Sequence, residues 1–579
     1  MKKLLEYAGS YKKYTFAAIG ILLLATVCGV LPFLFLYQII LPLMTGTDRE
    51  AGYYILRVAL ILVCSLAHGW LYTQGLALSH TSAYHTLRNI RVSLQEKIEN
   101  QPLGVIREKG VGTLKKMFID DIDDLELLLA HALPEGVANL TVPLAVMVTI
   151  FVVDWRLGLL SLCSLPLGVL AMGAMYHSGM SKMGAYYASA QKMNDTIVEY
   201  VNGMEVVKVF NRDGESLRRY EKDVTDYRDF TLDWFKACWP WMAIYSSILP
   251  CITLISLPVG AWLVVKGTVA LTDLCLALCM SFGIGGPLVR ALDFASTMPQ
   301  INFKLDALEK LAEAPALQQK EAPFSGKDHS IDIEKVTFAY QEAEVLHGVS
   351  LHIPEGAMVA LVGPSGSGKS TLAKLLVHFY DVTGGSVSIG GQDVRDMSLE
   401  SLNDQISYVA QEQFLFNTTL RENIRMGRPG ASDEEVLAAA EKAQCGEFLR
   451  RLPKGLDTKA GDGGKMLSGG ERQRISLARA ILKNAPIVVL DEATAFMDPE
   501  NEEKMNAAIA QIIRGKTVIV IAHRLPSIVN ADQICVLNEG SIAAVGTHQE
   551  LLAGCPEYQT LWSAAEESSA WGVTSGEVR

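Results

Sequence analysis

The first half of the chain contains six long stretches without Asp, Glu, Lys or Arg. A helix needs about 20 apolar residues to cross a bilayer, and five of these stretches have that length or nearly so. The sixth is shorter and contains Pro287, so we expect its helix to extend past Arg290 and to bend. The number and spacing of the stretches predict six transmembrane helices rather than the buried helices of a large soluble protein. They are Tyr14–Thr47, Val58–Leu87, Gly136–Val153, Leu157–Ser181, Ala237–Val265 and Leu274–Val289.

The positive charges predict how these helices are oriented. Lysines stand at positions 2, 3, 12 and 13, and the connections 88–135 and 182–236 are rich in Lys and Arg, whereas the other turns are short. By the positive-inside rule, both termini and both long connections lie in the cytoplasm of a cell-membrane protein. The first apolar stretch is far longer than the hydrophobic core of a signal peptide, so we expect it to remain in the mature protein.

Each long connection contains one break in an otherwise helical pattern, at residues 109–114 and 200–205. We expect the helices to continue past the bilayer and to be interrupted there by short elements that dock on a cytoplasmic domain. Plain loops are the alternative.

Polar side chains within a bilayer are costly, so those in the apolar stretches are candidates for function. The candidates are His68, Gln74, His80 and Asn139, the pair Arg290 and Asp293, and the aromatic residues Trp239, Trp241 and Tyr245. Each has a simpler explanation. The first four residues would form interhelical hydrogen bonds, the charged pair an interfacial ion pair, and the aromatic residues an interfacial belt.

A glycine-rich segment in the second half has the pattern of a phosphate-binding loop. It follows the apolar run 358–362, which predicts a strand, and precedes the helical pattern 372–376. Small residues allow successive backbone N–H groups to turn toward an anion at the positive end of the helix. We expect Lys369 to reach the β- and γ-phosphates of a nucleotide and Ser370 to hold Mg²⁺. The loop consists of Gly363, Pro364, Ser365, Gly366, Ser367, Gly368, Lys369, Ser370 and Thr371.

Two further strand patterns end in residues that suit phosphoryl transfer. The apolar run 487–490 precedes Asp491, which suits Mg²⁺ coordination through water, and Glu492, which suits a base that polarises the attacking water. The run 517–522 ends at His523, which we expect to sense the γ-phosphate, although a lone histidine is more often structural.

Ser468, Gly469 and Gly470 open another helical pattern. Ser468 and Glu471 have the spacing of a capping box, which is an ordinary helix N-terminus. The two glycines also leave backbone amides open to a phosphate. Spacing alone leaves both interpretations open.

The composition changes between residues 311 and 330, where the pattern predicts a linker. Residues 1–310 then form an α-helical transmembrane domain, and residues 331–579 form an α/β domain with interspersed strand and helix patterns. The formal net charge of -12 argues against nucleic acid as the main partner, because such a partner requires a basic surface.

Several of these motifs, in this order, resemble those of the ATP-binding cassette (ABC) transporters. Gly363–Ser370 looks like Walker A, Leu467–Gln473 like the signature segment, and Ile487–Asp491 like Walker B. The resemblance implies that Glu492 is the catalytic glutamate and His523 the switch histidine.

The resemblance extends to three residues that spacing did not single out. Gln411 resembles the Q-loop residue that contacts Mg²⁺, Asp498 resembles the D-loop aspartate, and Tyr340 resembles the aromatic residue that stacks on adenine. The segment 493–498 departs from the Ser-Ala-Leu-Asp ending of many exporters but retains Asp498.

The family architecture implies an exporter-type half-transporter with six transmembrane helices and one P-loop ATPase domain. Its cofactors are ATP and Mg²⁺, and each ATP lies between Walker A of one subunit and the signature of the other. This arrangement implies a second half-transporter subunit, in a homodimer or a heterodimer. The breaks near Gly110 and Gly203 resemble coupling helices.

Three functions remain open at this point. The leading expectation is ATP-driven transport of an amphipathic small molecule across the lipid bilayer, with export as the default direction of the fold. Segments 423–430, 461–464 and 498–502 resemble the siderophore importers built on the exporter fold, which implies uptake of a metal chelate as the second possibility. The third is an ATP-gated membrane regulator that transports nothing; the presence of Glu492 argues against it, because gating by binding needs no efficient hydrolysis.

Overall fold

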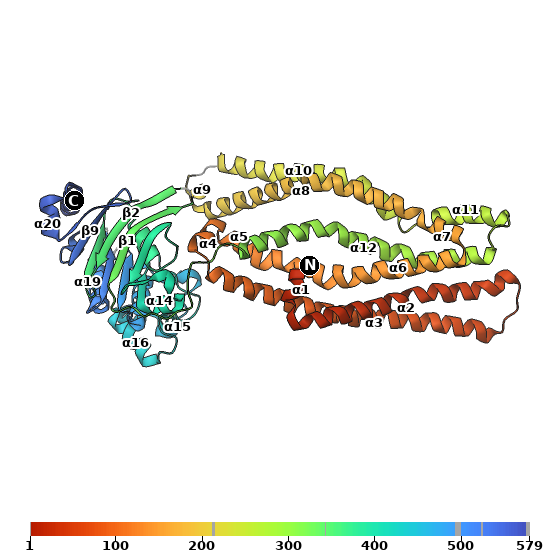
Figure 1. The fold of residues 1–579 in the computed structure, drawn as a ribbon, viewed down its shortest axis with the longest axis horizontal. Coiled ribbons are helices and arrows are strands. Elements are labelled where there is room, and N and C mark those ends of the chain that lie inside the picture. The colour runs from red at the N-terminus through yellow and green to blue at the C-terminus, as the bar shows by residue number, and fades with distance from the viewer. Residues whose placement is uncertain (1, 211–214, 342, 492–498, 523–524, 575–579) are drawn as a thin grey trace. The chain divides into compact units, whose positions relative to one another are not determined.

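The computed structural model describes residues 2–210, 215–341, 343–491, 499–522 and 525–574. It divides into two compact units (Figure 1). Unit 1 comprises Met1–Glu99 and Val111–Glu313, and unit 2 comprises Asn100–Gly110 and Ala314–Arg579.

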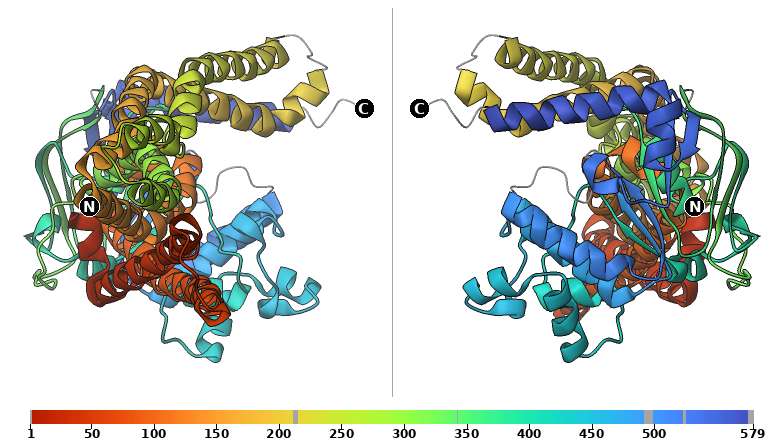
Figure 2. Two further views of the ribbon diagram at one scale, coloured as in Figure 1. Left: turned by 90° about the vertical axis from the view of Figure 1, so that its right-hand side faces the viewer. Right: turned by 90° about the vertical axis from the view of Figure 1, so that its left-hand side faces the viewer.

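Unit 1 is built from helices, several of them long. Helix α8 lies beside α10 in Figure 1 and in both views of Figure 2. The long helices are α2 (Lys12–Thr45), α3 (Ala51–Glu99), α6 (Leu133–Val153), α8 (Ser164–Asn202), α10 (Glu215–Ile248) and α12 (Leu271–Ala312). The short ones are α1 (Lys2–Tyr7), η1 (Gly9–Tyr11), α5 (Val111–Lys116), α7 (Trp155–Leu162), α9 (Met204–Phe210), α11 (Thr253–Val265) and two π-helical turns, η2 (Met117–Asp121) and η3 (Leu127–Ala132).

The membrane-spanning helices agree with the six predicted stretches. Among the described residues, 5 helices are long and apolar enough to cross a membrane, or up to 6 if a bent pair counts as one span. The bent pair is Leu217–Ile248 with Thr253–Val265, which meet at 42°. Pro250 lies in this break and has no backbone N–H to continue the helix. The last helix, α12, extends past Arg290 as expected, while its predicted bend stays a prediction.

Close contacts join the helices of unit 1. The hydroxyl groups of Thr15 on α2 and Ser82 on α3 lie 2.7 Å apart. The Nδ1 atom of His68 lies 2.6 Å from the carbonyl oxygen of Ala25, so the expected interhelical hydrogen bond of His68 is confirmed. Tyr245 donates to Asp293 Oδ1 at 3.2 Å, and the ion pair of Asp293 with Arg290 stays a prediction.

Both breaks in the long connections separate helices. Helix α4 (Leu103–Lys109) ends at Gly110, whose φ of 73° lies in the left-handed region. Helix α9 begins directly after Gly203. The element that docks on the α/β unit is α4, just before the predicted break: Leu103 N donates to Phe379 O at 3.0 Å, whereas α5 after the break belongs to unit 1. Docking of α9 on a cytoplasmic domain stays a prediction.

Unit 2 contains two sheets. A 4-stranded antiparallel sheet has the order β2-β1-β4-β5, and a 6-stranded sheet has the order β10-β9-β3-β8-β7-β6. Within the second sheet, β9, β3, β8, β7 and β6 run parallel. The strands are β1 (Ile331–Tyr340), β2 (Ala343–Ile353), β3 (Met358–Val362), β4 (Gly384–Ile389), β5 (Gln392–Asp393), β6 (Ile406–Val409), β7 (Ile487–Asp491), β8 (Thr517–Ile521), β9 (Gln533–Asn538) and β10 (Ser541–Gly546).

The parallel strands β3, β7 and β8 are the predicted apolar runs, and β7 is buried along its whole length. Because parallel strands end at the same edge of a sheet, the carboxyl ends of β3 and β7, Val362 and Asp491, lie at one edge. The helices of this unit are α13 (Lys369–Leu376), α14 (Leu399–Gln405), α15 (Leu420–Arg425), α16 (Asp433–Lys442), α17 (Gly446–Arg451), α18 (Gly469–Lys483), α19 (Pro499–Ile513), α20 (His548–Gly554) and α21 (Pro556–Thr574), with 3-10 turns η4 (Val394–Asp396), η5 (Gly455–Asp457), η6 (Asp462–Gly464) and η7 (Leu525–Ile528).

Candidate nucleotide site

The glycine-rich loop joins β3 to the N-terminus of α13, as the sequence predicts. Gly363, Gly366 and Gly368 have φ angles of 149°, 81° and 99°, which side chains rarely tolerate. A Cβ atom at Gly363 would lie 2.0 Å from the carbonyl oxygen of Leu537 on β9. The loop therefore requires glycine for its backbone path, and its last residues lead into the positive end of a helix.

Lys369, the first residue of α13, is 5% exposed. Its Nζ donates to the carbonyl oxygens of Gly363 at 3.0 Å and Pro364 at 2.8 Å, and it lies 3.4 Å from Ser367 Oγ. The loop thus holds a buried ammonium group against its own backbone. Such a group suits the binding of phosphate oxygens, since buried charges interact more strongly than exposed ones.

The next residue, Ser370, meets the carboxylate at the end of β7. Its hydroxyl donates to Asp491 Oδ1 at 2.9 Å, and Asp491 is 2% exposed. These oxygen atoms come from two neighbouring elements and are the ligand type that Mg²⁺ prefers. Ser370 and Asp491 therefore fit the Mg²⁺ that a bound nucleotide requires.

Tyr408, which the sequence analysis missed, binds the other oxygen of Asp491. Its hydroxyl donates to Oδ2 at 3.0 Å, because β6 lies beside β7 with Tyr408 opposite Val489. Burial, and then the negative charge of Asp491, raise the pKa of Tyr408 well above its ordinary value. The tyrosine therefore stays a neutral donor that orients the carboxylate. The sequence signal that could have identified Tyr408 is its hydroxyl group within the short strand pattern just before Gln411.

Tyr340, at the end of β1, lies in an aromatic cluster. Its ring is edge-on to Phe338 at 4.8 Å and to Tyr380 at 5.3 Å, and its hydroxyl lies 3.3 Å from Thr371 Oγ1. Tyr340 and Tyr380 also line a cavity of about 550 Å³ together with residues of α4. The structure thus places Tyr340 next to the loop residue Thr371, and its stacking on adenine stays a prediction.

Ser468 caps the N-terminus of α18. The amide of Glu471 donates to Ser468 Oγ at 3.3 Å, and the amide of Ser468 donates to Glu471 Oε2 at 2.9 Å, so the capping box is formed. Cβ atoms placed on Gly469 and Gly470 would meet nothing within 4 Å. The first turn of α18 therefore has open space beside its glycines, which leaves room for a phosphate.

Arg479, a second residue that the sequence analysis missed, connects α18 to the chain beyond Gln411. Its guanidinium donates to Asn423 O and Asn423 Oδ1, both at 2.6 Å, and to Phe414 O at 2.8 Å. Burial lowers the pKa of Arg479 to about 10, so it remains charged at neutral pH. The signature helix and the segment after Gln411 are thereby joined by one half-buried cation.

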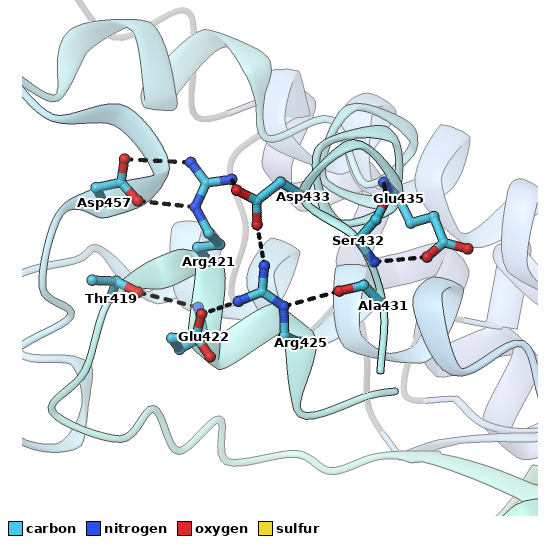
Figure 3. A network of polar contacts seen from close by, with 9 residues as sticks. All are labelled: Thr419, Arg421, Glu422, Arg425, Ala431, Ser432, Asp433, Glu435 and Asp457. Carbon is cyan, nitrogen blue, oxygen red and sulfur yellow. Dashed lines mark hydrogen bonds and ion pairs between the residues drawn. The ribbon is translucent and has the colours of Figure 1, made fainter. Parts of the chain in front are cut away.

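A network of charged residues holds the helices next to this segment (Figure 3). Arg421 on α15 donates to Asp457 Oδ1 at 2.9 Å and lies 3.5 Å from Asp433 Oδ2. Arg425 on α15 contacts both Glu422 and Asp433, the first residue of α16. The hydrogen bond from Arg421 lowers the pKa of Asp457. The network fixes α15 against α16, and with it the position of Asn423.

Of the remaining four predicted site residues, the structure describes only Gln411. Gln411 lies two residues after the end of β6, the strand that pairs with β7. Glu492, Asp498 and His523 lie outside the described residues. Their roles stay predictions, although β7 and β8, which precede Glu492 and His523, pair side by side.

Comparison with known proteins identifies the family. The model of the ABC transporter transmembrane region matches residues 16–288, and the ABC transporter model matches residues 346–495. The ATP-dependent lipid A-core flippase of Syntrophus aciditrophicus is 31% identical over 521 residues, which cover 87% of this chain and 84% of that protein. The chain belongs to the ABC transporter family. It is a multi-pass membrane protein, and its two units are the transmembrane and nucleotide-binding parts of an ABC transporter.

Two further similarities bear on function. The mycobactin import ATP-binding/permease protein IrtA of Mycolicibacterium smegmatis is 34% identical over 565 residues, which cover 96% of this chain and 65% of IrtA. The chain thus spans less than two thirds of that ABC transporter's length. Its fold is similar to the structure of a bacterial Atm1-family ABC exporter with ATP bound, with a TM-score of 0.81 and 27% identity, covering 96% of this chain and 98% of the exporter.

Proposed function

We propose that this chain is one subunit of a dimeric ABC transporter in which ATP hydrolysis drives an amphipathic small molecule across the cell membrane. One observation supports this most strongly: the buried Lys369 and the Ser370–Asp491 pair meet at the junction of β3, β7 and α13. A loop that merely turned the chain would need neither a buried ammonium group nor a buried carboxylate beside it. Both termini lie in the cytoplasm in this proposal.

Each residue of the site has a role in this proposal. The loop amides and Lys369 bind the β- and γ-phosphates, while Ser370, Asp491 and Gln411 hold Mg²⁺. The bound Mg²⁺ supplies positive charge that neutralises the phosphate oxygens. Glu492 orients the attacking water, and His523 contacts the γ-phosphate; both act by positioning, which is most of what phosphoryl transfer requires of a protein.

A second subunit completes the site. The open first turn of α18, with Ser468, Gly469 and Gly470, binds the phosphates of the nucleotide held by the partner's loop. Asp498 lies at the same interface in this arrangement. The partner is a second copy of this chain or a different half-transporter.

Export is the first direction that we propose, because the overall fold is that of a solved exporter over 96% of this chain. Import of a metal-chelating siderophore is the second candidate. The alignment with the mycobactin import protein IrtA supports import, because that alignment spans 96% of this chain, whereas the alignment with the lipid A-core flippase spans 87%.

The experiment that tests this proposal starts with the tagged chain purified from its own membranes, to find whether a different subunit accompanies it. The complex is then placed in vesicles of known orientation, and ATPase activity is measured with an iron-loaded chelator, the iron-free chelator and lipid or drug probes. Stimulation by the iron-loaded chelator alone, with ATP-dependent movement toward the nucleotide side, supports import. Movement away from the nucleotide side supports export, and ATP turnover without movement of any probe contradicts transport in favour of a regulator.

A further inference from the structure

A cluster of two histidines and two glutamates lies in the transmembrane unit, and none of these residues belongs to the nucleotide site. His80 is on α3, His131 is on η3, Glu126 precedes η3, and Glu135 is in the first turn of α6. One candidate ligand atom each from His80, Glu126 and His131 lies within 4.8 Å of the others. We propose that these three side chains form a binding site for a divalent transition-metal ion of the zinc class.

The donor set suits such an ion. Imidazole nitrogens with one carboxylate oxygen are a common zinc ligand set. Zinc–ligand bonds of about 2.0–2.2 Å place two ligands of one tetrahedral ion about 3.3 Å apart. His80 Nδ1 and Glu126 Oε1 are already 3.0 Å apart, and the imidazole rings of His80 and His131 are 4.9 Å apart between centroids, at an angle of 80°. All three donor atoms lie within 4.8 Å of one another, so the atoms that are farther apart must approach by about 1.5 Å to share one ion.

The groups behind the proposed ligands orient them. Glu135, which is 4% exposed, accepts a hydrogen bond from His131 Nδ1 at 2.6 Å through Oε1 and one from Tyr72 at 2.6 Å through Oε2. A carboxylate accepts but does not donate, so the proton lies on Nδ1 and the lone pair of His131 Nε2 is available to a metal. Tyr84 donates to Glu126 Oε2 at 3.2 Å, which leaves Oε1 facing His80.

The backbone around the cluster is also fixed. Ser79, next to His80, is 0% exposed and donates to the carbonyl oxygen of Ala130, next to His131, at 2.5 Å. The segment with His131 is π-helical, a form that often occurs at functional sites. The hydrogen bond between Ser79 and Ala130 therefore holds α3 against η3 at the point where the two histidines face each other. Ordinary hydrogen bonding explains the His80–Glu126 and His131–Glu135 pairs taken singly. It does not explain why ligand atoms of His80, Glu126 and His131 come together.

Three protein ligands leave one position of a tetrahedral ion open, as in zinc sites where water or substrate takes the fourth position. The site thus offers that position to water or to one further donor. A bound ion would link α3, inside one predicted span, to η3 and the residue that precedes it, in the connection before the next predicted span.

The test uses the full chain, with any accompanying subunit, in lipid nanodiscs after removal of any polyhistidine tag. The protein is stripped with a chelator and dialysed against buffered Zn²⁺, bound zinc is counted by mass spectrometry, and Co²⁺ replaces zinc to give a visible spectrum of its coordination. We expect about one high-affinity ion per chain with a tetrahedral Co²⁺ spectrum, and loss of both in His80→Ala and in His131→Ala. Glu135→Gln, which alters only the orienting group, should weaken binding about 10–100-fold.

The matched control is His177→Ala, which removes an exposed histidine of α8 and should leave zinc binding unchanged. Thermal melting in chelator separates loss of the site from loss of the fold, because a folded variant melts like the wild type when zinc is absent. The proposal is wrong if the wild type binds no zinc, or if folded His80→Ala and His131→Ala variants retain wild-type zinc affinity. The readout is independent of ATP turnover, so it stands apart from the proposed transport function.

Discussion

At the scale of single residues, the nucleotide site is organised around Asp491. Its two oxygens accept hydrogen bonds from hydroxyl groups on both sides, Ser370 at 2.9 Å and Tyr408 at 3.0 Å. The sequence predicted Asp491 and Ser370, because a carboxylate after an apolar strand and a serine in a phosphate loop have known partners. It did not predict Tyr408, because strand order decides which side chain faces that carboxylate.

Replacement of Tyr408 by phenylalanine removes one donor to Asp491 without changing shape. We expect the variant to lose about 0.5–1.5 kcal/mol of stability at neutral pH. Because the pKa of Tyr408 is higher in the folded state than in the unfolded one, its contribution is complete below about pH 10 and declines as the pH rises further. The difference between wild type and variant should therefore shrink above about pH 10. Chemical denaturation at neutral and alkaline pH measures it, with Tyr176→Phe as the exposed control; a constant difference would refute the account.

Replacement of Lys369 by alanine removes the buried ammonium group of the loop. We expect ATP turnover to fall by at least about 100-fold, because charge stabilisation at the phosphates is the main catalytic contribution available here. Steady-state phosphate release measures the effect. Lys442→Ala, at an exposed position of α16, should retain wild-type turnover, and equal turnover in both variants would exclude Lys369 from the site.

At the scale of elements, the structure adds detail that sequence patterns lack. The breaks near Gly110 and Gly203 were predicted, since glycine interrupts helical patterns. The packing of α4 on Phe379 and Tyr380 was not predicted from residues alone, because it depends on contacts between segments nearly 280 residues apart. The π-helical turns η2 and η3 also escaped prediction, since apolar periodicity does not distinguish them from an α-helix.

The contact of α4 with Tyr380 gives a prediction for Gly104. A Cβ at this position would lie 3.0 Å from Tyr380 Cε1, so Gly104→Val should push α4 from its place. We expect the variant to retain basal ATP hydrolysis while substrate-stimulated hydrolysis falls several-fold. Gly112→Val on α5, where a Cβ would meet nothing within 4 Å, is the matched control. If the Gly104 variant kept wild-type stimulation of ATP hydrolysis by substrate, α4 would play no part in passing the substrate signal to the nucleotide-binding unit.

At the scale of the whole molecule, the sequence predicted the fold class because both parts carry strong patterns. Six uncharged stretches indicate membrane helices, and apolar strands that end at a glycine loop and at a carboxylate indicate a P-loop domain. The assignment of residues 100–110 to the nucleotide-binding unit required the structure, because these residues lie within the helical half of the sequence. The convergence of His80, Glu126 and His131 also required it, since His80 is 46 residues or more from the other two.

The central claim is that ATP hydrolysis at a site shared by two subunits drives transport. ATP-dependent movement of probes in oriented vesicles tests it most directly, with the wild type compared with a complex in which every copy of this chain carries Glu492→Gln. We predict ATP-dependent movement of an amphipathic probe by the wild type, and neither movement nor steady-state hydrolysis at this chain's site in the variant, which should still bind ATP and favour the closed dimer. Normal hydrolysis and movement in a homodimeric variant, or hydrolysis without movement of any probe by the wild type, would contradict the claim.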